Sequence, residues 1–131
     1  MDRREIVLRL VLNAICDDYE NVDQVILREV AEYGSKCGLT IDRSEIVDAL
    51  AKLIEDGLAK AYDLSVREPF STELQGMPAI DLVEEDFKTY FYITKKGLDL
   101  KLADDRWWPF DDEGSLRPNW HLELPQPQGR H

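Results

Sequence analysis

Residues 41–58 read IDRSEIVDALAKLIEDGL and contain the start and stop signals of one helix. Asp42 suits the N-cap position, and Glu45 three residues later completes a capping box, in which cap side chain and third-residue side chain each accept from the other's backbone N–H. Gly57 stands where a left-handed residue closes a helix. The sequence therefore predicts a helix over residues 43–56.

This helix is expected to be amphipathic because its apolar residues recur three and four positions apart. The apolar stripe consists of Ile46, Ala49, Leu50, Leu53 and Ile54. The outward face is expected to consist of Arg43, Ser44, Val47, Asp48, Ala51, Lys52 and Glu55. On that face, Val47 and Ala51 would form a small apolar strip bordered by charges, which suits contact with another protein.

Two further helices are expected before this one. The first, from Asp2 to about Asp18, is apolar around most of its circumference and must be covered on two sides. Its own domain or a second copy of the chain can supply that cover, and we expect a homodimer through this helix. The second begins at Asn21, a good N-cap, and is closed by Gly34 and Gly38, which begin a short connection.

Two strands and a short helix are expected after Gly57. Apolar and polar residues alternate over residues 58–66 and again over residues 87–94, as in half-buried strands. These strands are expected to pair as a hairpin with a long tip, and residues 79–83 are a candidate third strand. Thr94 is then expected to cap a last helix over residues 95–103.

This order of three helices, strand, loop, strand and closing helix is similar to that of winged helix-turn-helix domains. The resemblance rests on Leu50, Leu53, Gly57 and Leu58, and on Tyr92, Ile93, Thr94 and Gly97. It implies one winged-helix domain over residues 1–103, mainly α with a small β-hairpin and therefore of the α+β class. In that family the helix corresponding to residues 43–56 enters the major groove of DNA, so the resemblance also implies DNA binding.

The charge balance weighs against DNA binding. The 131 residues include 16 Lys and Arg against 27 Asp and Glu, a net charge of -11. Affinity for nucleic acid depends mainly on cations that neutralise phosphates, and the outward face of residues 43–56 holds only Arg43 and Lys52. Lys95 and Lys96 are the candidate phosphate contacts if DNA is bound.

We therefore expect a non-catalytic regulatory or protein-interaction module of transcription-factor ancestry, with a protein partner favoured over nucleic acid. A dimeric, sequence-specific DNA-binding transcriptional regulator is the alternative. The two readings differ in the surface potential that the outward face of residues 43–56 should show.

Residues 104–131 differ from the rest of the chain, because they hold all three tryptophans and four of the six prolines. So much aromatic surface is too apolar to be left in water, so we expect an irregular strap packed on the domain or on a partner subunit. Its candidate anchoring residues are Trp107, Trp108, Phe110 and Trp120. They would act either as a latch to the domain or as an anchor for a partner.

The sequence carries no enzyme or cofactor motif. It has no glycine-rich phosphate loop and no HExxH, and Cys16 and Cys37 lack the spacing of a metal site. We expect no catalysis, cofactor or metal. No apolar run reaches the length of a membrane span, and two unpaired cysteines fit a reducing compartment, so a cytoplasmic protein is expected.

Overall fold

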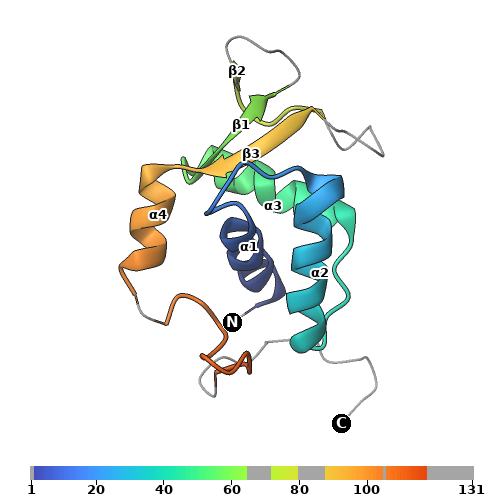
Figure 1. The fold of residues 1–131 in the computed structure, drawn as a ribbon, viewed down its shortest axis with the longest axis vertical. Coiled ribbons are helices and arrows are strands. Elements are labelled where there is room, and N and C mark those ends of the chain that lie inside the picture. Colours follow the sequence, from blue (N-terminus) through green and yellow to red (C-terminus); the bar gives the residue numbers. More distant parts are fainter. Residues whose placement is uncertain (1, 65–71, 80–87, 105, 118–131) are drawn as a thin grey trace.

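The computed structural model describes residues 2–64, 72–79, 88–104 and 106–117, which form an α+β fold (Figure 1). In chain order the elements are α1 (Arg3–Ala14), the π-helical segment η1 (Val22–Ile26), α2 (Leu27–Lys36), α3 (Arg43–Glu55), β1 (Ala59–Asp63), β2 (Thr72–Leu74), β3 (Thr89–Ile93) and α4 (Lys95–Leu102).

The predicted strands form β1 and β3, which pair antiparallel from Ala59 opposite Ile93 onward. The described residues contain one further strand, which was not predicted. It is β2, which pairs with the free edge of β1 and gives the sheet order β2-β1-β3. Most of the segment expected to be a strand, residues 80–83, lies outside the described residues. The other edge of β3 is met by Glu20, whose N–H and C=O both bond to Phe91, at 3.0 and 2.9 Å.

Helix α1 lies at the centre of the molecule, with α2 and α4 on opposite sides and α3 between it and the sheet (Figure 1). Ile6, Leu10 and Val11 are at most 1% exposed. The apolar circumference of α1 is thus covered within one chain and does not by itself require a second copy. The helix ends at Ala14, earlier than predicted, because the carbonyl of Ile15 accepts the N–H of Ile93 and draws the chain toward β3.

Asn21 begins the second helical segment as predicted. Its side chain accepts from the backbone of Asp23 and Gln24, and its Nδ2 donates to the carbonyl of Thr89 at 2.9 Å. Helix α2 continues past Gly34 to Lys36, and Gly38, the second glycine expected to close it, is left-handed with φ +74° just beyond the helix end. Gly34 lies inside the helix, where an added Cβ would lie 2.7 Å from Ile41 Cδ1.

Helix α3 confirms its predicted boundaries. Asp42 accepts from the N–H of Glu45 at 3.0 Å, the Glu45 carboxylate accepts from the N–H of Asp42, and Gly57 is left-handed with φ +76°. One prediction for its outward face is wrong, because Val47 is only 6% exposed. With both α1 and η1 packed on it, α3 is buried over a wider arc than one apolar stripe.

Helix α4 is attached to the sheet at its start. The Thr94 hydroxyl accepts from the N–H of Gly97, as the prediction of an N-cap requires, and donates to the carbonyl of Gly57 at 2.7 Å. Gly97 is the one residue of α4 that is buried. The rest of this short helix lies on the surface.

Residues 106–117 fold back across the helices. Trp107 and Phe110 are buried, and Arg9 on α1 donates to the carbonyl of Trp107 at 2.9 Å. Trp108 and Phe110 both pack against the ring of Tyr33 on α2. This part of the chain therefore closes the core on the side away from the sheet.

Candidate interaction surface between the first and third helices

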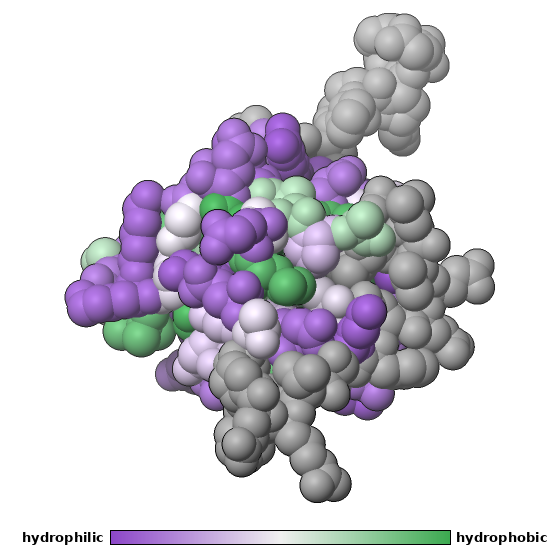
Figure 2. Space-filling view, turned by 90° about the horizontal axis from the view of Figure 1, so that it is seen from above, coloured by the Kyte–Doolittle hydropathy of each residue, from purple (hydrophilic) through white to green (hydrophobic). Residues whose placement is uncertain are grey.

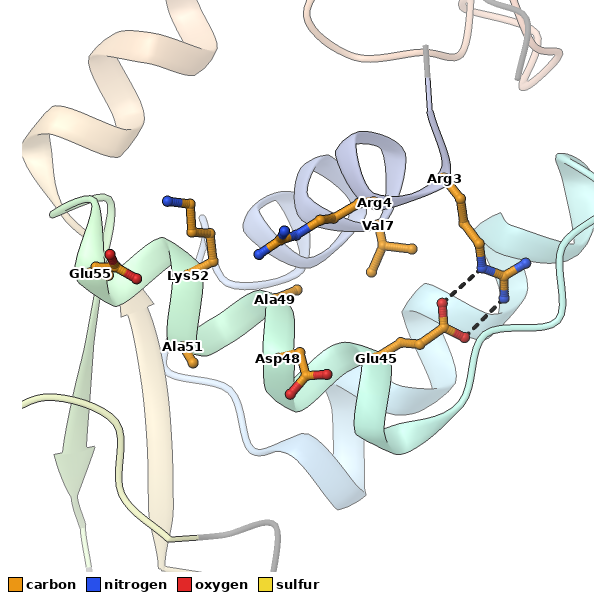
Figure 3. Close-up of a pocket in the computed structure, with 9 residues that line it drawn as sticks. All are labelled: Arg3, Arg4, Val7, Glu45, Asp48, Ala49, Ala51, Lys52 and Glu55. Atoms are coloured by element: carbon orange, nitrogen blue, oxygen red, sulfur yellow. Dashed lines mark hydrogen bonds and ion pairs between the residues drawn. The ribbon is translucent and has the colours of Figure 1, made fainter. Parts of the chain in front are cut away.

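Viewed from the sheet, the surface is mostly hydrophilic (Figure 2). An open groove of about 640 Å³ lies between α1 and α3, and we call it the α1–α3 groove (Figure 3). It is lined by Arg3, Arg4, Val7, Glu45, Asp48, Ala49, Ala51, Lys52 and Glu55. Small apolar side chains form its floor and charged side chains form its rim.

One end of the groove is closed by an ion pair between α1 and α3. Arg3 Nε and Nη2 donate to the two carboxylate oxygens of Glu45, at 2.8 and 2.9 Å, and Arg3 also donates to the carbonyl of Thr40 (Figure 3). The hydrogen bonds from Arg3 lower the pKa of Glu45, and Glu45 raises the pKa of Arg3. This guanidinium is therefore held by the protein itself.

The cations that were expected to contact DNA also have partners within the chain. Arg43 makes two bonds to the carboxylate of Asp23 on η1, at 2.7 and 3.1 Å, and so turns away from the groove. Lys52 pairs with Asp56 at 3.3 Å.

The two lysines at the start of α4 are engaged in the same way. Lys95 pairs with Asp99 at 2.9 Å, and Lys96 donates to the carbonyl of Asp56 at 2.8 Å. Lys52, Lys95 and Lys96 therefore each have an oxygen partner within the chain.

Three charged groups of the groove are left without an ion pair in the part of the chain that the structure describes: Arg4, Asp48 and Glu55. Figure 3 shows Arg4 extending from α1 across the groove, while Asp48 lies on the edge of α3 farther from α1. Asp48 and Glu55 are seven residues apart, which places them about 10 Å apart along the helix. The uncompensated charge of the groove is thus one guanidinium against two carboxylates.

The structure brings together four of the seven residues predicted for the outward face. Asp48, Ala51, Lys52 and Glu55 line the groove. Val47 is in the core, and Ser44 donates to Asp42 at 2.8 Å outside the groove. Sequence reasoning missed Arg3, Arg4 and Glu45 as groove residues. The paired arginines at the chain start were the available signal, but nothing in the sequence shows that α1 packs along α3.

The aromatic residues of the C-terminal segment pack within the chain. Trp108 is half-buried against Tyr33 and Phe110, and the Lys36 ammonium lies 5.1 Å from the centroid of the Tyr33 ring and 5.9 Å from that of Phe110. The chain's own Lys36 therefore occupies the position over these rings that a cation from a partner could take. Trp120, the fourth predicted anchor, lies outside the described residues.

The two cysteine thiols are poorly suited to nucleophilic chemistry. Burial raises the pKa of both half-buried thiols, Cys16 and Cys37, which makes them poorer nucleophiles. Among the described residues, no three His, Cys, Asp or Glu side chains come together as a metal site.

None of the described helices has the length and apolar character needed to cross a membrane. Comparisons with protein-family models, with curated proteins and with solved structures find no match to this chain.

Proposed function

We propose that the protein is a non-catalytic interaction module of the winged-helix type, which binds a protein partner in the α1–α3 groove. The order of three helices, paired strands and a short closing helix supports a winged helix. The groove then includes the exposed side of the third helix, the element with which winged-helix regulators read DNA.

The observation that carries the proposal is that most of the cations of α1 and α3 form ion pairs with carboxylates of the same chain. Arg3 and Arg43 each make two bonds to a carboxylate, and Lys52 is matched by Asp56. A DNA-binding domain typically makes about 6–10 phosphate contacts. Turning Arg43 toward a phosphate would first break its two charge-assisted hydrogen bonds to Asp23, each worth about 1.5–3 kcal/mol.

A helical protein segment with cationic side chains fits this surface better. Val7, Ala49 and Ala51 provide a shallow apolar floor without bulky side chains, so a partner helix can lie close to α3. Asp48 and Glu55 then face two Lys or Arg side chains spaced by two helical turns on the partner. The partner expected is thus an amphipathic helix with basic residues seven positions apart.

The DNA alternative is tested by fluorescence anisotropy with a random-sequence duplex, measured from 25 to 200 mM salt. We expect no saturable binding at 150 mM salt with up to about 100 µM protein. Micromolar binding that weakens steeply as salt rises would contradict the proposal and favour the DNA-binding regulator, with Lys95 and Lys96 on phosphates.

The groove is tested with a designed helical peptide that carries an apolar stripe and two lysines seven positions apart. We expect it to shift the NMR amide signals of α1 and α3, and we expect the double variant Asp48→Lys, Glu55→Lys to weaken binding at least tenfold. The control Glu32→Lys changes the same kind of charge at an exposed position of α2 and should have little effect. Equal weakening by both variants would mean that only net charge matters.

A further inference from the structure

Three charged residues of α3 that line the α1–α3 groove follow one stripe along the helix. Asp48, Lys52 and Glu55 are separated by four and then three positions, a spacing that places side chains on the same helix face. In order along α3 their charges are negative, positive and negative. The two negative ends are the carboxylates already matched with basic residues of a partner helix, whereas the positive centre has no partner residue assigned to it.

Arg4 of α1 adds a second cation beside the centre of this stripe. Figure 3 shows its side chain reaching from α1 toward the part of α3 that carries Ala49 and Lys52, and all three residues line the groove. Arg4 is exposed and has no ion pair among the residues that the structure describes. Ala49 is buried and contributes only a methyl group to the groove floor. The middle of the groove is therefore positive, between two negative ends.

We propose that Arg4 and Lys52 together bind a carboxylate of the partner helix, and we call this pair the central subsite. The partner then presents a basic, an acidic and a basic residue along one face. This inference rests on the proposed function, because it requires a helix in the α1–α3 groove. It adds that the residue between the partner's two basic residues is acidic, which the carboxylates of the groove do not determine.

Lys52 can contact a partner carboxylate without loss to the fold. Its ammonium lies 3.3 Å from the carboxylate of Asp56, four residues later in the chain, and the two side chains are 37% and 44% exposed. Exposed ion pairs at this spacing are weak and are screened by solvent. An ammonium also has three N–H donors, so Lys52 can bond a second carboxylate while it keeps Asp56.

The two arginines that begin the neighbouring segments do not compete for this carboxylate. Arg3 donates to both carboxylate oxygens of Glu45, which closes one end of the groove. Arg43 donates to both carboxylate oxygens of Asp23 and lies outside the groove lining. A carboxylate of the partner is therefore expected at the central subsite rather than at either of these arginines.

The spacing on α3 also sets where the acidic residue stands on the partner. A helix that runs parallel to α3 repeats the order of Asp48, Lys52 and Glu55, so its acidic residue follows the first lysine by four positions. In a helix that runs antiparallel, the acidic residue follows the first lysine by three positions. Both positions share a face with the two lysines. A third basic residue there would instead meet like charge, which disfavours partners that are basic throughout.

Three versions of the designed lysine peptide test the central subsite by fluorescence anisotropy. One carries Gln at both the third and the fourth position after the first lysine, and each of the other two replaces one of these glutamines with Glu. At about 50 mM salt, where surface charges are less screened, we expect one Glu peptide to bind the natural chain about threefold more tightly than the Gln peptide. The position that gains affinity gives the direction of the partner helix.

Reversing the charge of Arg4 should reverse this preference. The variant Arg4→Glu should bind the Gln peptide more tightly than that Glu peptide, and an acidic residue in the first turn of α1 is compatible with the helix. The control Arg28→Glu makes the same charge change at an exposed position of α2 and should keep the preference for Glu. Because the same peptides are compared on each protein, any effect of Glu on the helicity of the free peptide cancels.

The possible failures of the central subsite and of the groove are distinguishable. Equal binding of the Gln peptide and both Glu peptides to the natural chain overturns the central subsite and leaves the groove as a binding site. The same conclusion follows if Arg4→Glu and Arg28→Glu show the same preference. If none of the three peptides binds saturably, both the proposed function and the central subsite are overturned.

Discussion

At the scale of single residues, two polar side chains connect local structure to the tertiary fold. Glu45 completes the capping box of α3 and also accepts two hydrogen bonds from the Arg3 guanidinium. Asn21, only 1% exposed, caps the second helical segment and also donates to β3 through the carbonyl of Thr89. Each residue was predicted as part of a helix cap, and each has a second, long-range partner that makes it part of the core arrangement.

The Arg3–Glu45 pair should make stability depend on pH. Arg3 lowers the pKa of Glu45 in the folded protein, so the pair stabilises the fold above about pH 4.3, the usual glutamate pKa. That contribution is lost as the pH falls further and Glu45 becomes protonated. We expect Arg3→Gln to lower the free energy of unfolding by about 0.5–1 kcal/mol at pH 7, because both side chains are about a third exposed.

The difference between Arg3→Gln and the natural chain should shrink toward zero near pH 3, as measured by urea unfolding at several pH values. Lys95→Gln is the matched control. Its pair with Asp99 lies on an exposed face of one helix and is screened by solvent, so the control should change stability much less than Arg3→Gln does at pH 7. A loss for Arg3→Gln that is the same at pH 7 and pH 3 would assign the role of Arg3 to packing.

At the scale of elements, glycines decide how closely helices approach their neighbours. A Cβ at Gly97 would clash with the carbonyl oxygen of Leu58 and would lie 2.8 Å from Ile93 Cγ1. Backbone atoms at this site cannot move without disturbing the end of α3 and the start of β1. A Cβ at Gly34 would instead meet Ile41 Cδ1 at 2.7 Å, the far end of a side chain that can rotate.

Gly97→Ala should therefore be far more damaging than Gly34→Ala. We expect Gly97→Ala to lower the free energy of unfolding by about 2–3 kcal/mol, because α4 must shift away from the sheet. For Gly34→Ala we expect a net change below about 1 kcal/mol, since the higher helix propensity of alanine, about 1 kcal/mol, offsets the movement of Ile41. Urea unfolding of both variants gives the comparison, and equal losses would contradict it.

At the scale of the whole molecule, residues 106–117 complete the core on the side opposite the sheet. Trp107 is 5% exposed, and its carbonyl and ring are both contacted by Arg9, whose guanidinium lies 5.5 Å from the ring centroid. Phe110 is 2% exposed between Tyr33 and Trp108. These contacts favour the latch over the partner anchor as the role of the segment.

If the segment is a latch, Trp107→Ala should lower the free energy of unfolding by about 3–5 kcal/mol, as expected for a large side chain removed from a core. Leu102→Ala, at a position 68% exposed, should change it by less than about 0.5 kcal/mol. Both values are measured by urea unfolding at 5 µM protein. A small effect of Trp107→Ala would favour the partner anchor.

The signals that act within a few residues predicted the local structure well. Capping by Asp42, Asn21 and Thr94 was confirmed, as was the left-handed Gly57. These signals depend on hydrogen bonds between neighbours in the chain, so the sequence contains all that is needed to find them. The pairing of β1 with β3 was also predicted, because both strands alternate in register with one buried face.

The sequence by itself therefore determined the helix boundaries set by caps, the two principal strands and a net charge that disfavours nucleic acid. Only the tertiary structure decided that Val47 is buried, that Arg43 binds Asp23, and that Arg3 closes the groove on Glu45. The partners of Arg43 and Arg3 lie 20 and 42 residues away in the chain. Which charges meet across such distances depends on how the helices pack, and no local pattern in the sequence encodes that.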